Sequence, residues 1–113
     1  MKEVMAAVFC ILLGTPSLQA AEDLVFVRGR GLVDIDPFAC TDITTSNFLR
    51  RVCYDEANLY LLIELRDIWH HYCEVDGVIV AAFLNAPSAA SFYNSNIRSG
   101  PFDCRRKRMP HYE

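Results

Sequence analysis

The sequence predicts a small α+β domain: a three-stranded antiparallel meander followed by two short helices packed on one face, with an N-terminal arm that carries a short strand. Three observations predict this class. Residues 48–74 contain three β-prone runs joined by short loops. Residues 76–97 change to a helical spacing of apolar side chains. A chain of 113 residues has room for one such domain.

The three expected strands are defined by their composition and by the loops between them. Residues 48–54 (FLRRVCY) form the first, and residues 55–58 form a hairpin loop. Residues 59–65 (LYLLIEL) are the most apolar run after residue 20, so we expect them to be the central strand. A tight turn at residues 66–67 leads into the third strand, residues 68–74 (IWHHYCE). Short loops between successive strands favour an antiparallel meander.

Two short helices are expected after the strands. Asp76 is placed to cap the first helix. One face of that helix would bury Val78, Ile79, Ala82 and Phe83. Pro87 ends it, and Ser88 is placed to cap the second helix, residues 89–97. The buried face of the second helix would hold Phe92, Tyr93 and Ile97. Both helices would cover one face of the sheet.

The first twenty residues resemble a secretory signal peptide. Lys2 belongs to a weak positively charged region, residues 4–13 form an apolar run, and residues 18–20 (LQA) end in a small residue at the expected cut. The run is shorter than the roughly 20 residues that a membrane-spanning helix needs. The alternative is a buried N-terminal helix. We expect residues 1–20 to be removed and the mature bacterial protein to be periplasmic or secreted.

The rest of the chain divides into an arm, a domain and a tail. Residues 21–45 form an N-terminal arm with a β-prone run at residues 24–27, and they contain too few apolar side chains to fold alone. We therefore expect the arm to cover the sheet face that the helices leave open. Residues 46–100 form the domain, and residues 101–113 form a basic, otherwise featureless C-terminal tail.

Four cysteines remain after residue 20: Cys40, Cys53, Cys73 and Cys104. An even number in a small exported domain predicts disulfides, and the lack of any C-x-x-C pair argues against zinc. In the expected meander Cys53 and Cys73 lie on the outer strands, about 10 Å apart. A disulfide spans at most about 6.8 Å between Cα atoms, so a Cys53–Cys73 bond is excluded. Each must pair with Cys40 on the arm or Cys104 on the tail, and both such arrangements stay open.

Several short segments match one family pattern in order. They are residues 52–55 (VCYD), 61–65 (LLIEL), 72–75 (YCEV) with 83–88 (FLNAPS), and 92–94 (FYN) with 97–98 (IR). Over residues 46–100 the chain resembles the KTSC domain, a family named for its occurrence at the C-terminus of some lysyl-tRNA synthetases. The resemblance implies a small module with no settled activity, for which RNA binding has been suggested.

The chain departs from this family in two places. The family's tyrosine-x-tyrosine appears as His70-His71-Tyr72, and residues 89–91 (AAS) stand where relatives tend to carry Lys-Gly-Lys. The missing lysines and the net charge of −3 weaken the case for RNA binding, because nucleic-acid binders are usually basic. RNA binding is therefore kept as the alternative function and is not the expected one.

The sequence contains no convincing active site. His70 and His71 are adjacent in a strand, so their side chains point to opposite faces and cannot share a metal ion. The cysteines are expected to be oxidised and are then not nucleophiles. No serine lies in a G-x-S-x-G motif. We expect no enzyme, no cofactor and no metal, and an enzyme that uses His70 or His71 is the weaker alternative.

Two sets of residues are candidates for a binding surface. Side chains of the third strand and second helix could line a groove: Trp69, His70, Tyr72, Tyr93 and Arg98. A basic run could hold a protein or another anionic partner: Arg105, Arg106, Lys107 and Arg108. Core packing of the aromatic residues and a solvated tail are the respective alternatives. The expected function is an exported, non-enzymatic binding or interaction module.

Export has a direct test. Intact-mass measurement on protein from a bacterial periplasmic fraction should show a chain that begins at Ala21, or one residue to either side, because a signal peptidase cuts after small residues. A full-length cytosolic product that retains Met1 would contradict export and would remove the basis for expecting disulfides.

Overall fold

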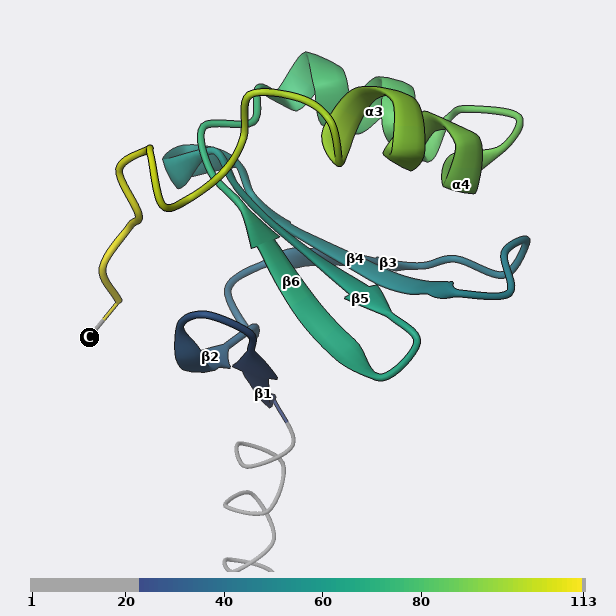
Figure 1. The fold of residues 1–113 in the computed structure, drawn as a ribbon. Coiled ribbons are helices and arrows are strands. Elements are labelled where there is room, and N and C mark those ends of the chain that lie inside the picture. Colours follow the sequence, from purple (N-terminus) through teal and green to yellow (C-terminus); the bar gives the residue numbers. More distant parts are fainter. Residues whose placement is uncertain (1–22, 113) are drawn as a thin grey trace, which may run out of the picture.

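The computed structural model of the protein describes residues 23–112, so the expected signal peptide lies outside the described residues. These residues form one sheet with the strand order β2-β1-β6-β5-β4-β3, and helices cover one of its faces (Figure 1). The strands are β1 (Leu24–Val27), β2 (Gly31–Asp34), β3 (Ala39–Asp42), β4 (Leu49–Asp55), β5 (Tyr60–Leu65) and β6 (Ile68–Tyr72). The helical elements are η1 (Glu56–Asn58), α3 (Gly77–Leu84), α4 (Ala89–Phe92) and its π-helical continuation η2 (Tyr93–Ile97).

The expected meander is present as β4, β5 and β6, which pair antiparallel in order. The expectation of a three-stranded sheet was wrong, because the arm adds three strands. β1 and β2 form an antiparallel hairpin, whose turn includes Gly29 at φ 87°. This hairpin joins the edge of β6 through one parallel pair, Val27 with Trp69. β3 joins the opposite edge by pairing with β4.

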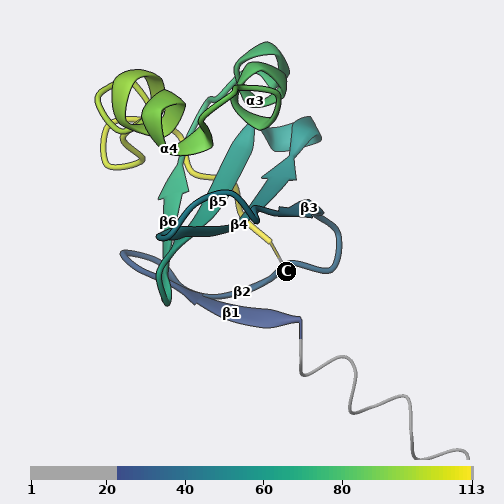
Figure 2. The same cartoon turned by 90° about the vertical axis from the view of Figure 1, so that its right-hand side faces the viewer.

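The arm covers the sheet face opposite the helices, as Figure 2 shows with the β1–β2 hairpin and the helices on opposite sides of the sheet. Its apolar side chains Val27, Val33, Ile35 and Phe38 are buried in one core cluster with Tyr60 and Leu62 of β5. The alternate β5 residues, Leu61 and Ile63, lie in a second cluster under the helices. β5 therefore contributes to both cores, as expected for the most apolar strand.

The helices agree with their expected positions but not with the expected buried face of α3. Val78, expected to be buried, is 79% exposed, and Ala82 is exposed as well, whereas Val80 and Phe83 pack on the sheet. The sequence of α3 is GVIVAAFL, apolar on every side, so its pattern could not identify the buried face. In α4 the Ser88 side chain accepts a hydrogen bond from the Ser91 N–H at 3.2 Å, which confirms the cap. No helix within residues 23–112 is both long and apolar enough to cross a membrane.

Two disulfides between described residues join the arm and the tail to the sheet. Cys40 on β3 bonds to Cys53, its direct partner on β4, with the Cα atoms 4.0 Å apart. Cys73, just after β6, bonds to Cys104 on the tail, with the Cα atoms 5.0 Å apart. This is one of the two pairings that the sequence left open, with Cys53 and Cys73 on either side of β5.

The tail is not featureless, because residues 101–112 pack along the sheet. The Phe102 carbonyl accepts a hydrogen bond from the Cys73 N–H at 2.8 Å. The Tyr112 hydroxyl donates to the Asp55 carboxylate at 2.5 Å. Arg30 of the β1–β2 turn lies over the rings of Tyr60 and Tyr112, 5.2 Å from each centroid. These contacts connect the tail to both the sheet and the arm.

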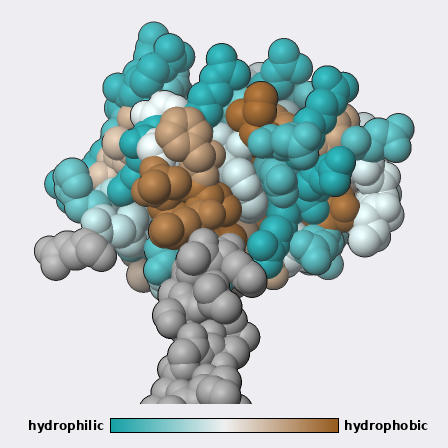
Figure 3. Space-filling view, turned by 90° about the horizontal axis from the view of Figure 1, so that it is seen from below, coloured by the Kyte–Doolittle hydropathy of each residue, from teal (hydrophilic) through white to brown (hydrophobic). Residues whose placement is uncertain are grey.

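The outer face of the β1–β2 hairpin is apolar. Val25, Val27 and Val33 point inward, so the alternate residues Leu24, Phe26 and Leu32 point outward and are exposed. Phe26 and Leu32 are cross-strand partners. Figure 3 views the molecule from below Figure 1, which is the side on which the hairpin lies, and it shows an apolar patch on the surface.

Removal of the Cys40–Cys53 bond should destabilise the fold. A loop of about 15 residues contributes roughly 3 kcal/mol in the chain-entropy model, so the double variant Cys40→Ala with Cys53→Ala should lose about that much unfolding free energy. Urea unfolding followed by circular dichroism measures it. A loss below about 1 kcal/mol would show that packing alone holds the arm. Non-reducing peptide mapping checks the pairing independently.

Candidate functional site

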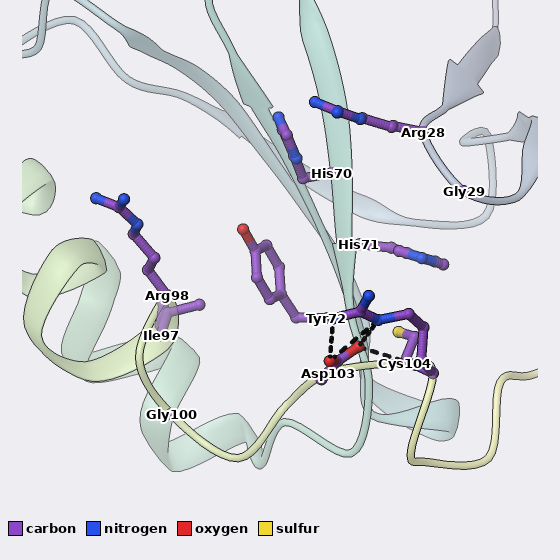
Figure 4. Close-up of a pocket in the computed structure, with 11 residues that line it drawn as sticks. Arg28, Gly29, His70, His71, Tyr72, Ile97, Arg98, Gly100, Asp103 and Cys104 are labelled. Carbon is purple, nitrogen blue, oxygen red and sulfur yellow. Dashed lines mark hydrogen bonds and ion pairs between the residues drawn. The ribbon is translucent and has the colours of Figure 1, made fainter.

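The candidate site lies at the outer edge of β6, where the arm and the tail leave the strand partly uncovered. A cavity of about 530 Å³ opens there. It is lined by four segments that are distant in sequence: Arg28 and Gly29 of the arm, residues 70–72 of β6, residues 97–100 at the end of η2, and residues 103–105 of the tail. Figure 4 shows these segments around the cavity. Two of them lie outside the expected domain of residues 46–100.

Successive side chains of β6 point to opposite faces of the sheet, so the residues of the expected binding surface lie on two different faces. Trp69 is buried in the cluster under the arm, and His71 contacts Tyr60 on that same face. His70 and Tyr72 point to the helix side, and Figure 4 shows Tyr72 and Arg98 on the same side of the cavity. The structure thus brings together His70, Tyr72, Tyr93 and Arg98, but it places Trp69 on the other face of the sheet.

Tyr72 lines the helix side of the cavity and contacts Tyr93 of η2. Their hydroxyl groups share a hydrogen bond of 2.6 Å, and their rings meet edge to face. Burial, followed by the hydrogen bond to Tyr93, raises the pKa of Tyr72 far above its usual range. The Tyr72 hydroxyl therefore stays protonated. The pair connects β6 to η2 and fixes the position of Arg98 one residue after η2.

The two histidines are mainly neutral near pH 7. Burial, and then the Arg28 guanidinium, lower the pKa of His70. Burial, and then Arg30, lower the pKa of His71, whose Nδ1 shares a hydrogen bond of 2.8 Å with the Tyr60 hydroxyl. Neither histidine is hydrogen-bonded to a carboxylate within residues 23–112, and that part of the chain contains no group of three metal-ligating side chains.

The permanent charges around the cavity are mainly positive. Arg28, Arg98 and Arg105 line it together with one carboxylate, Asp103. Arg105 holds that carboxylate in an ion pair of 2.8 Å, and the hydrogen bonds from Arg105 lower the pKa of Asp103 to about 2. Neither Arg28 nor Arg98 forms an ion pair with a carboxylate among the described residues. Arg98 Nη1 donates to the Asn94 side-chain oxygen at 3.4 Å, and the other donors of Arg98 and those of Arg28 remain available to an anionic ligand.

The basic run of the tail does not act as one surface. Arg105 lines the cavity, whereas Lys107 pairs with Glu74 at 3.4 Å. Arg106 lines a separate hollow with Gly100 and Pro101. Arg98 instead connects the main cavity to a second one of about 420 Å³. Residues that line the second cavity include Phe48, Leu65, Ile68 and Tyr93.

Sequence reasoning missed Arg28, Gly29 and Asp103. Residues 28–31 (RGRG) have the composition of a turn and lack the pattern of a phosphate loop, so the sequence gives no signal that Arg28 lies at a binding site. Asp103 precedes Cys104, and the Cys73–Cys104 bond places it beside β6. Knowledge of the Cys73–Cys104 pairing would therefore have been enough to predict that the tail lies at this site.

The fold is that of a small α+β module, with helices on one face of an antiparallel meander and a basic cavity at the sheet edge. Residues 45–102 match the family model of the KTSC domain, and the chain belongs to this family. The crystal structure of a KTSC domain protein from Yersinia pestis is similar, with a TM-score of 0.54 and 24% sequence identity over 58% of this chain and 92% of that one. At this identity the similarity describes the fold alone. No curated protein sequence matches the chain.

The electrostatics of the cavity can be tested by histidine titration. Both pKa values should lie below about 6.5, so the unfolded chain binds more protons below that pH and stability should fall as the pH drops through this region. Replacing Arg28 with Gln should raise the pKa of His70 more than that of His71, and replacing Arg30 with Gln should do the reverse. NMR titration of the ring protons measures both. Equal shifts in the two variants would contradict the assigned geometry.

Proposed function

We propose that the protein is an exported, non-enzymatic binding module that holds an anionic ligand in the cavity beside β6. The observation that carries this proposal is that Arg28 and Arg98 both line the cavity without carboxylate partners among the described residues, in a protein whose net charge is −3. Guanidinium groups bind carboxylate and phosphate oxygens through paired hydrogen bonds. The neutral His70 and the protonated Tyr72 add polar contacts without opposing charge.

Export is supported by the covalent framework. Disulfides persist in oxidising compartments and are rare in the cytosol. Among the described residues, Cys73–Cys104 joins the tail, which lines the cavity, to the end of β6. Cys40–Cys53 fastens the end of the arm to β4, and the β1–β2 turn of the same arm lines the cavity. A site assembled in this way depends on an oxidising environment. The same dependence supports a periplasmic or secreted location.

RNA binding, the function suggested for the family, has less support here. A contiguous basic face would need Arg50 and Arg51 together with Arg98. Arg51 forms an ion pair with Asp42 at 3.2 Å, and Glu64 lies close enough to interact with Arg50 and Arg51. These arginines are thus interspersed with carboxylates. The chain also lacks the lysines that relatives carry before the second helix.

The test is an NMR titration of the ¹⁵N-labelled mature protein with sodium acetate and with inorganic phosphate. At least one anion should shift the amide signals of residues 70–72 and 97–100 most strongly. Replacing Arg28 and Arg98 together with Gln should weaken binding at least about tenfold, since each charge-assisted hydrogen bond contributes about 1.5–3 kcal/mol. The matched variant Arg50→Gln removes an exposed arginine outside the cavity and should bind as the wild type does.

Two outcomes would contradict this proposal. The first is the absence of any anion-induced shift at the cavity, or shifts confined to residues 106–108. The second is tight binding of single-stranded RNA at physiological salt with a steep salt dependence, which would indicate an extended basic surface.

A further inference from the structure

The outer edge of β6 has one unpaired position, at His71. Alternate residues of a strand direct their main-chain N–H and C=O groups to the same edge. On this edge, the Trp69 carbonyl accepts from the Arg28 N–H at 2.9 Å, and the Cys73 N–H donates to the Phe102 carbonyl at 2.8 Å. Between them, the N–H and C=O of His71 make no hydrogen bond to any residue in the described part of the chain. At this edge, His71 therefore presents a free main-chain donor and a free acceptor, and His71 lines the cavity.

A ligand that pairs with this edge has room for a single residue in register. An extended residue opposite His71 would donate its N–H to the His71 carbonyl and accept from the His71 N–H, as in an antiparallel pair. The open edge is limited on one side by the hydrogen bond between Arg28 and Trp69. On the other side it is limited by the hydrogen bond between Phe102 and Cys73. A peptide that continued along the edge in both directions would overlap both segments. A peptide that ends opposite His71 meets only one of them and leaves the edge there, so a chain end fits this position and an internal segment does not.

The charges of the cavity favour the C-terminal end of a peptide over its N-terminal end. Arg28 and Arg98 line the same cavity as the main chain of His71, and Asp103 is already paired with Arg105. Guanidinium groups repel an N-terminal ammonium group and bind a terminal carboxylate through paired hydrogen bonds. Both oxygens of a carboxylate would be used, one by the His71 N–H and one by an arginine.

We propose that the cavity captures the C-terminal carboxylate of an extended peptide, whose last residue pairs with the main chain of His71 while Arg98 and Arg28 hold the carboxylate. The proposal rests on the proposed function, because it assigns the ligand of the same cavity. It differs from simple anion binding in requiring the main-chain N–H of the peptide and the free edge of β6.

The primary experiment compares two pentapeptide libraries with the same randomised positions, one with free C-terminal carboxylates and one with C-terminal amides. Retention on the immobilised mature protein should be at least about tenfold greater for the free acids, the factor that corresponds to about 1.4 kcal/mol. Acetate and inorganic phosphate serve as competitors. The His71 amide signal of the ¹⁵N-labelled protein should move when the free-acid library is added and stay in place with the amides.

A pair of variants isolates the main chain of His71. His71→Pro removes the N–H that faces the open edge, and proline is tolerated at such positions because that N–H is not part of the β5–β6 pairing. His71→Ala loses the same side chain but keeps the N–H. The proline variant should bind the free-acid library at least about tenfold more weakly than the alanine variant. If circular dichroism shows that the proline variant is unfolded, the shift of the wild-type His71 amide signal on addition of the free-acid library tests the proposal instead.

Equal retention of acids and amides, or equal binding by the proline and alanine variants, would overturn this inference. A cavity that binds acetate or phosphate as tightly as the free-acid peptides would also overturn it and leave the proposed function intact. The absence of binding by every anion and every peptide would overturn both.

Discussion

The structure depends on the burial of β5 on both faces. Tyr60 and Leu62 face one side and Leu61 and Ile63 the other, and none of them is exposed to solvent. A meander with helices on one face would leave Tyr60 and Leu62 in water, at a cost of about 1.5–3 kcal/mol for each large apolar side chain. The arm removes this cost by placing Ile35 and Phe38 over the second face. A strand that is apolar on both faces thus requires a second cover, and the arm provides it.

The binding site follows from how this cover is attached. The arm reaches β6 through one residue pair and then turns away, and the tail reaches the same edge only at Cys73. The disulfides hold both segments in place, one at β3 and β4 and the other at the end of β6. Between the two attachments the edge stays open at His71, in a cavity that is also lined by Arg28 of the arm and by Arg98, just after η2. The cavity is therefore a consequence of covering the sheet from both chain ends.

The parts of the fold that the sequence could predict are those specified by local pattern. The apolar run of β5, the turns of the meander and the Ser88 cap depend on neighbouring residues. β3, with the sequence ACTD, has no strand pattern of its own and exists because β4 and a disulfide hold it. The buried face of α3 was not predictable, since all its sides are apolar. Of the site, His70, Tyr72 and Arg98 were among the candidate binding residues, whereas His71 was not. Arg28 and Asp103 come from distant segments that only the folded chain brings together.

The most direct measurement of the central claim is amide hydrogen exchange in the unliganded mature protein. The open edge predicts that the His71 N–H exchanges much faster than the Cys73 N–H, which is bonded to the Phe102 carbonyl on the same edge. The comparison is internal, because both amides belong to one segment and share its global stability. Equal protection of the two amides would show that the edge is closed at His71 and would contradict the site described for this chain.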